Sequence, residues 1–278
     1  MRRRQFLTTM TLLAGPGGLS AQPAAPALPP GSTGKPAPTT TCKAVMVIDI
    51  LTGKILLQKN AREKRAVAST QKLLTALLLC EAGNLDRKAT ASEYDEAAEP
   101  TKIYLKPGSS YPRREILKAM LMKSANDCAR CLARTHAGSE DDFAKLMNKR
   151  ALLLGMQDSH FVNASGLPGD QHSTARDMAL LARAAYLQPV IRSIVNQAES
   201  TFTHADGRVV KLHNTNHLLT TDPYCNGMKT GYTDAAGKCL ISSATHKGRT
   251  VIAVLLGGSS SKIWGEAKLL LHWGLGVA

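Results

Sequence analysis

Ser69 and Lys72 stand three residues apart in the small, apolar stretch AVASTQKLLTA, and their types could support nucleophilic chemistry. If the stretch is helical, residues at i and i+3 share a face, so the hydroxyl would lie beside the amine. A serine hydroxyl is a weak nucleophile at neutral pH and needs a base within hydrogen-bond reach. Lys72 could be that base if burial and a neighbouring cation such as Lys229 lower its pKa. Taken alone, the pair also fits a helix-capping serine followed by a surface lysine.

The Ser-x-x-Lys spacing is uninformative by itself, because it occurs three times in this chain. The copy at Ser69 is followed by two motifs that each occur once, Ser124-Ala125-Asn126 and Lys229-Thr230-Gly231. Each of these also has an ordinary explanation, the first as a helix cap and the second as a strand end. The interpretation therefore depends on all three motifs together and on their order.

In this order the motifs resemble the Ser-x-x-Lys, Ser-x-Asn and Lys-Thr-Gly set of penicillin-binding proteins and class A β-lactamases. From about Ala44 to Gly274 the chain is similar to low-molecular-mass penicillin-binding proteins of the D-alanyl-D-alanine carboxypeptidase family. Two further stretches carry the likeness, SHFVNASGLPGDQHSTARDMALLARAA at 159–185 and GMKTGYTDAAGKCLISSA at 227–244. The resemblance implies the transpeptidase fold of that family and the activity of a serine peptidase.

The resemblance also implies a role for each residue of the motifs. Ser69 would attack a peptide carbonyl and form an acyl-enzyme, with Lys72 as its base. Ser124 would pass a proton towards the leaving amine, and the backbone N–H groups of Ser69 and Tyr232 would form the oxyanion hole. The implied substrate-binding residues are Asn126, Lys229, Thr230 and Gly231.

The leading functional prediction is a serine-type D-Ala-D-Ala carboxypeptidase that trims peptidoglycan stem peptides and is acylated by β-lactam antibiotics. Several family members carry histidine after Lys-Thr-Gly, where this chain has Tyr232, so a DD-endopeptidase that cuts cross-links stays open as an alternative. A β-lactamase is less favoured, because such enzymes usually deacylate through a dedicated glutamate and Glu199 is only a weak candidate. A non-catalytic cell-wall binder is the remaining alternative.

The charge of the chain favours an anionic partner, since its formal net charge is +14. Basic residues are scattered, however, and no nucleic-acid-binding signature accompanies them. We therefore expect a wall polymer rather than nucleic acid.

The first 42 residues read as export and linker sequence. Residues 1–21 combine three arginines with a short apolar run and are predicted to be a signal peptide. Their removal would leave a net charge of +11. The motif RRQFL within them is similar to a twin-arginine signal. Residues 22–42 are rich in Pro, Ala and Thr and predict a linker, so the catalytic domain is expected at 43–278. The expected location is periplasmic or extracellular, without a stable membrane anchor after signal cleavage.

The cysteine and histidine pairs of the sequence do not indicate a further site, and no metal or cofactor is predicted. The spacing of Cys128 and Cys131 is more typical of buried structural thiols than of half a metal or redox site. Cys225 and Cys239 flank a turn and could form a disulfide in an exported chain, although pairing cannot be read from sequence. The histidines at 213 and 217 lack an obvious acidic third ligand, which favours solvated side chains.

The element pattern predicts an α+β fold. Two β-hairpins are expected, one around Thr52-Gly53 and one around His246-Lys247-Gly248. Helical periodicity covers the intervening chain and its last segment, at 69–82, 114–123, 127–138, 140–155, 178–187 and 262–274. The first and last strands should therefore share an antiparallel sheet flanked by helices, with a mainly helical lobe inserted between them.

Overall fold

The computed structural model describes residues 36–277. Its first element is the antiparallel hairpin of β1 (Ala44–Asp49) and β2 (Ile55–Lys59), which turns at residues 50–54. The turn is stabilised by the Asp49 carboxylate, which accepts hydrogen bonds from the backbone N–H and hydroxyl of Thr52 at 3.0 and 2.9 Å. The predicted first hairpin is therefore present.

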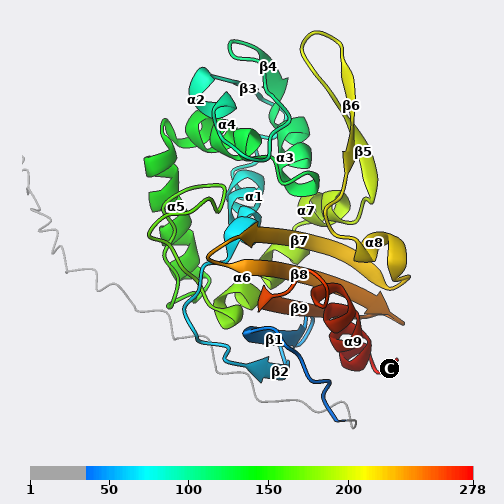
Figure 1. Ribbon diagram of the computed structural model, residues 1–278. Helices are drawn as coiled ribbons and strands as arrows, with labels where there is room; N and C mark the ends of the chain where they lie inside the picture. Colours follow the sequence, from blue (N-terminus) through cyan, green and yellow to red (C-terminus); the bar gives the residue numbers. More distant parts are fainter. Residues whose placement is uncertain (1–35, 278) are drawn as a thin grey trace, which may run out of the picture.

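The hairpin joins strands from the other end of the chain in one five-stranded antiparallel sheet, in the order β2-β1-β9-β8-β7 (Figure 1). The three C-terminal strands are β7 (Cys225–Thr233), β8 (Gly237–His246) and β9 (Arg249–Gly258). Ala44 of β1 lies opposite Leu256 of β9, so segments far apart in sequence are neighbours in the sheet. β7 is left as an edge strand, and the chemistry described below lies beside it.

Helices cover both faces of the sheet (Figure 1). Alternate residues of a strand point to opposite faces. In β1, Val45 and Val47 belong to the apolar cluster under α9 (Ile263–Leu275). Met46 and Ile48 belong to the larger core on the opposite face, which includes α6 (Ala175–Leu187).

The helical lobe stands beside the β7 edge of the sheet (Figure 1). Its helices pack around α1, whose side chains at Leu73, Leu74 and Leu77 are almost completely buried. The elements of this region are η1 (Ala68–Gln71), α1 (Lys72–Glu81), β3 (Lys88–Thr90), α2 (Glu93–Glu96), β4 (Ser110–Pro112), α3 (Arg113–Met122), α4 (Asn126–Ala137), α5 (Glu140–Leu153), α7 (Pro189–Val195), β5 (Glu199–Thr203), β6 (Val209–His213) and α8 (Leu218–Thr221).

The predicted α+β fold, with its shared sheet and inserted helical lobe, is confirmed. The short elements α2, α7 and α8 and the small β3–β4 pair were not predicted, because three to seven residues carry too little periodicity. Among residues 36–277 no single helix is long and apolar enough to cross a membrane, and the one pair that reaches that length together, α6 and α7, bends by 99°.

The end of the expected linker is part of the folded domain. The backbone N–H and hydroxyl of Thr41 donate to Glu266 Oε1 of α9, and the Thr40 hydroxyl donates to Glu266 Oε2 at 2.6 Å. Cys42 is completely buried. The expected signal peptide and the linker up to residue 35 lie outside the described residues.

The suggested disulfide between Cys225 and Cys239 is wrong. Cys225 lies opposite Ala244, and Cys239 lies opposite Gly231, so the two cysteines are at distant positions along the same strand pair. All six cysteines of the chain are free. Cys128 and Cys131 are buried in α4, as expected for structural thiols, and burial raises the pKa of the Cys131 thiol to about 12.

Candidate active site

Ser69 lies in η1, the single 3-10 turn that leads into α1. Lys72 is the first residue of α1, and its Nζ lies 2.8 Å from Ser69 Oγ. The spacing thus brings the hydroxyl and the amine together as predicted, although the turn at Ser69 is tighter than an α-helix. The preceding residue, Ala68, has φ of 49°, a left-handed conformation that costs free energy outside glycine. Such strain is typical of residues held in place for function.

Lys72 is completely buried and surrounded by oxygen atoms. Its Nζ donates to Asn126 Oδ1 at 2.8 Å and to the backbone carbonyl of Ser165 at 2.6 Å. Burial, together with the charge of Lys229, lowers the pKa of Lys72 well below its ordinary value. This environment favours the neutral amine that a base requires.

Ser124 and Lys229 form the second pair. Lys229 projects from β7, donates to Ser124 Oγ at 2.9 Å and to the Thr230 carbonyl at 2.9 Å, and is 1% exposed. Burial lowers the pKa of Lys229 to about 7. Ser124 joins α3 to α4 with φ of 64°, which turns the chain sharply enough to present both Ser124 and Asn126 to the site. The second and third motifs therefore meet side chain to side chain.

Gly231 lets β7 pass close to the nucleophile. A Cβ atom at this position would lie 2.8 Å from the backbone nitrogen of Ser69 and 3.0 Å from that of Thr70. Only glycine permits this approach, because real Cβ contacts are essentially never so short. The next residue, Tyr232, is 54% exposed, and its hydroxyl donates to Asp234. The strand that carries Tyr232 thus passes directly beside the backbone of Ser69, the other residue predicted to form the oxyanion hole.

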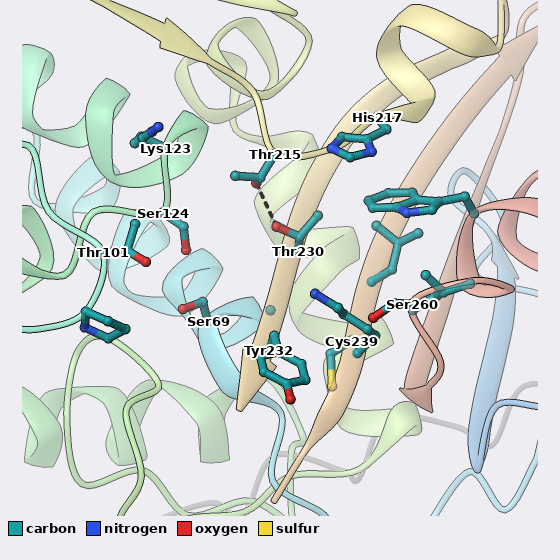
Figure 2. A pocket seen from close by; sticks show the side chains of 16 residues that line it. Ser69, Thr101, Lys123, Ser124, Thr215, His217, Thr230, Tyr232, Cys239 and Ser260 are labelled. Carbon is teal, nitrogen blue, oxygen red and sulfur yellow. Dashed lines mark hydrogen bonds between the residues drawn. The ribbon is translucent and has the colours of Figure 1, made fainter. Parts of the chain in front are cut away.

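A cleft of about 570 Å³ opens over these groups (Figure 2). Ser124 and Thr101 face Ser69 from the helical lobe, while Thr230 and Tyr232 face it from β7 (Figure 2). The Thr230 hydroxyl donates to Thr215 Oγ1 at 2.6 Å. None of the described residues that line the cleft is acidic. They are Ser69, Pro100, Thr101, Lys123, Ser124, Thr215, His217, Thr230, Gly231, Tyr232, Lys238, Cys239, Leu240, Ser260, Ile263 and Trp264.

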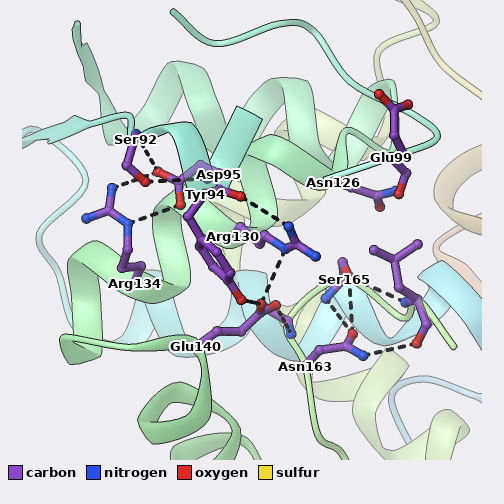
Figure 3. Close-up of polar contacts among 12 residues, drawn as sticks. Ser92, Tyr94, Asp95, Glu99, Asn126, Arg130, Arg134, Glu140, Asn163 and Ser165 are labelled. Atoms are coloured by element: carbon purple, nitrogen blue, oxygen red, sulfur yellow. Dashed lines mark hydrogen bonds and ion pairs between the residues drawn. The ribbon is translucent and has the colours of Figure 1, made fainter. Parts of the chain in front are cut away.

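Sequence reasoning missed the Ser165 carbonyl, which contacts both Ser69 and Lys72. Asn163 fixes this carbonyl, because its Oδ1 accepts from the N–H groups of Ser165 and Gly166 at 3.1 and 2.8 Å (Figure 3). Glu140 supports the same loop by accepting from Ala164 N at 3.0 Å (Figure 3). The stretch VNASGLPG lies within the segment that resembles the family, but a backbone carbonyl has no side-chain type to reveal its role.

Asn126 is held in place by hydrogen bonds to the backbone of residues 99 and 101. Its Nδ2 donates to the Glu99 carbonyl at 3.1 Å, and its backbone N–H donates to the Thr101 carbonyl at 2.7 Å. With Oδ1 on Lys72, the side-chain amide is oriented at both ends, so Asn126 can act as a fixed contact rather than a mobile one.

The other candidate residues are not part of the group around Ser69 and Lys72. Glu199 is on β5 and pairs with His213 at 3.1 Å, outside the residues that line the cleft. His217 stacks on Trp264 with ring centroids 4.7 Å apart at the rim of the cleft. Within residues 36–277, no group of three or more His, Cys, Asp or Glu side chains could hold a metal ion.

The sheet between helices, with Ser69 and the buried Lys72 paired at its edge, is the arrangement expected for the penicillin-binding class of proteins. The sequence model of the D-alanyl-D-alanine carboxypeptidase family, peptidase S11, matches residues 32–260. This chain therefore belongs to that family, which confirms the resemblance drawn from the motifs.

Among the relatives of this chain, some are named carboxypeptidases and others endopeptidases, which are the two activities that the sequence left open. D-alanyl-D-alanine carboxypeptidase DacF of Bacillus subtilis is 36% identical over 228 residues, which are 79% of this chain and 58% of DacF. A D-alanyl-D-alanine endopeptidase of Pseudomonas aeruginosa is 32% identical over 265 residues, 91% of this chain and 83% of the relative. The crystal structure of a D-alanyl-D-alanine carboxypeptidase from Mycobacterium tuberculosis matches with a TM-score of 0.84 and 31% identity, covering 91% of this chain and 97% of that one.

Proposed function

We propose that this chain is a serine-type D-alanyl-D-alanine carboxypeptidase that removes the terminal D-alanine from peptidoglycan stem peptides. The observation that carries the proposal is the 2.8 Å contact between Lys72 Nζ and Ser69 Oγ, which joins a completely buried lysine to a serine that lines the open cleft. A neutral amine at this distance can take the hydroxyl proton as the oxygen attacks.

Acylation begins when Ser69 Oγ attacks the carbonyl carbon of the penultimate D-alanine. The oxygen–carbon bond forms, the hydroxyl proton passes to Lys72, and the carbonyl oxygen becomes an oxyanion. Backbone N–H groups of Ser69 and Tyr232 stabilise that oxyanion, a contribution worth roughly 3–4 kcal/mol per donor in comparable sites. The close approach of Gly231 to Ser69 N supports this assignment.

The leaving group departs as an amine and must gain a proton. Ser124 Oγ lies 2.9 Å from Lys229 Nζ, so Ser124 can donate its proton to the amine nitrogen as the carbon–nitrogen bond breaks, and recover one from Lys229. The terminal D-alanine then leaves. Exchange with solvent returns Lys72 to the neutral amine and Lys229 to its protonated form. Water then attacks the carbonyl carbon of the ester on Ser69 while its proton passes to Lys72. Lys72 gives that proton to Ser69 Oγ as the carbon–oxygen bond breaks, which releases the shortened peptide and the free serine.

Two further parts of the proposal concern partners and location. β-Lactam antibiotics should acylate Ser69 by the same route, because their strained amide carbonyl offers the same target to the hydroxyl. The arginine-rich, apolar residues 1–21 support export to the periplasm or the extracellular space, where peptidoglycan is found.

The test combines labelling with product analysis. A fluorescent penicillin should form a covalent adduct on Ser69, and Ser69→Ala should abolish that adduct while the protein keeps its unfolding midpoint. Mass spectrometry of reactions with a defined stem pentapeptide should show loss of one D-alanine. A folded wild-type protein that forms no adduct would overturn the proposal.

The endopeptidase alternative is separated by the same analysis. The relative from Pseudomonas aeruginosa that carries the endopeptidase name supports testing a cross-linked muropeptide dimer beside the pentapeptide. Faster conversion of the dimer to monomers than release of D-alanine from the pentapeptide would assign the chain as an endopeptidase.

A further inference from the structure

Lys238 is a cation in the cleft to which the reaction steps above give no role. It lies near the start of β8, is half-buried, and lines the cleft together with Ser69 and Thr230. No ion pair or hydrogen bond joins its ammonium group to an acidic side chain in the described part of the chain. A partly buried charge without an acidic partner is suited to bind an anion.

The strand register places the side chain of Lys238 on the same face of the sheet as the side chain of Thr230. Lys238 lies directly opposite Tyr232, and Thr230 is two residues before Tyr232. Opposed residues of an antiparallel pair share a face, and so do alternate residues of one strand. The ammonium group also lies 4.4 Å from the centroid of the Tyr232 ring, and this cation–π contact holds the long side chain against β7.

The other cations in or beneath the cleft are less suited to hold a carboxylate. Lys72 is occupied by Ser69, Asn126 and Ser165. Lys229 is occupied by Ser124 and the Thr230 carbonyl, and burial lowers its pKa to about 7, so it carries only part of a charge near neutral pH. Lys123 is exposed on the opposite wall, where water screens its charge (Figure 2).

We propose that Lys238 is a specificity-determining residue that binds the terminal carboxylate of the substrate, together with the Thr230 hydroxyl. The inference rests on the proposed function, because it takes a peptide with a free carboxyl end as the substrate. A carboxylate beside Thr230 lies within the positive cleft and meets no acidic side chain among the residues that line it. The charge on Lys238 then selects acids over amides and aligns the scissile bond above Ser69.

The test measures how strongly the enzyme prefers a free carboxylate. A diacyl-lysyl-D-Ala-D-Ala peptide and its C-terminal amide are compared by kcat/KM in wild type and in Lys238→Met. Wild type should favour the acid, and Lys238→Met should lower kcat/KM for the acid by about 10- to 100-fold while changing the amide little. Lys238→Arg, which keeps the charge, should retain the preference.

Lys123→Met is the matched control, because it removes the other lysine of the cleft wall and should leave the acid-to-amide ratio unchanged. Labelling of Ser69 by fluorescent penicillin and the unfolding midpoint show that each variant is folded. An unchanged acid-to-amide ratio in Lys238→Met would overturn the inference, and so would equal losses on both peptides. Failure of wild type to release D-alanine from the acid would instead overturn the proposed function.

Discussion

The β7 edge of the sheet and the face of the sheet under α9 differ in the kinds of groups that they bury. At the β7 edge, two lysines are buried with 0% and 1% exposure, and two non-glycine residues, Ala68 and Ser124, adopt positive φ. Under α9 the buried side chains form an apolar cluster, and the hydrogen bonds from Thr40 and Thr41 to Glu266 lie outside this cluster. The first region contains groups that oppose folding, whereas the second contains groups that drive it.

This difference indicates that the β7 edge is the region where catalytic groups are positioned at the expense of folding stability. Burying an ammonium group and holding a backbone in a left-handed conformation both cost free energy. The costs are tolerated because they place Lys72 and Ser124 around the nucleophile. Substitutions at the β7 edge should therefore change activity far more than they reduce stability, while substitutions near α9 should do the reverse.

The largest expected effect is that of Lys72→Met. Acylation by a fluorescent penicillin should slow at least about 10³-fold, because the base is removed and the residual rate comes from binding and the oxyanion hole. The free energy of unfolding at pH 7 should rise by about 1 kcal/mol. The lost hydrogen bonds to Asn126 and Ser165 offset part of that gain.

The pH dependence of this stability difference has a definite sign. Because the pKa of Lys72 is lower in the folded protein than its ordinary value of 10.5, protonation favours the unfolded chain. That cost is largest below the folded pKa and disappears as the pH rises towards 10.5. The advantage of Lys72→Met, measured by urea unfolding, should therefore shrink at high pH. An advantage that grows with pH would contradict the burial argument.

Gly231→Ala should have the next largest effect. Its Cβ would lie 2.8 Å from Ser69 N, so β7 must move away from η1 and misplace the predicted oxyanion hole. A shift of this kind costs about 100-fold in acylation rate. Gly265→Ala in α9 is the matched control, because its Cβ meets nothing within 4 Å. It should keep full acylation and raise the free energy of unfolding by about 0.5–1 kcal/mol. Equal acylation rates for the two variants would show that the close approach is dispensable.

The smallest expected effect concerns Glu266. Burial would raise its pKa, but hydrogen bonds from Thr40 and Thr41 outweigh burial and lower the pKa to about 2. Since the folded pKa lies below the ordinary value of 4.5, the carboxylate stabilises the fold above pH 4.5, and that stability is lost as the pH falls towards 2. Glu266→Gln should cost about 1 kcal/mol at pH 7, after allowance for solvent screening, and nothing at pH 2. Thermal unfolding at both pH values checks this, with acylation unchanged throughout.

Local patterns in the sequence predicted the parts of the fold that are themselves local. The two hairpins and the long helices follow from turn residues and periodicity, and the motif order identified the residues that meet at the β7 edge. The disulfide suggestion failed because it depended on strand register, which a pair of cysteines does not reveal. The Ser165 carbonyl and Thr215 hydroxyl escaped notice because their importance comes only from what the fold brings beside them.

The placement of β1 between β2 and β9 has a consequence for biosynthesis. The first hairpin leaves the ribosome early, yet the strand that covers its open edge is among the last segments to be made. Until then both apolar faces of β1 lack their final partners, and an unpaired edge invites association with other chains. Chains that terminate before Arg249 should accordingly depend on chaperones or be degraded, even though every catalytic motif has already been translated.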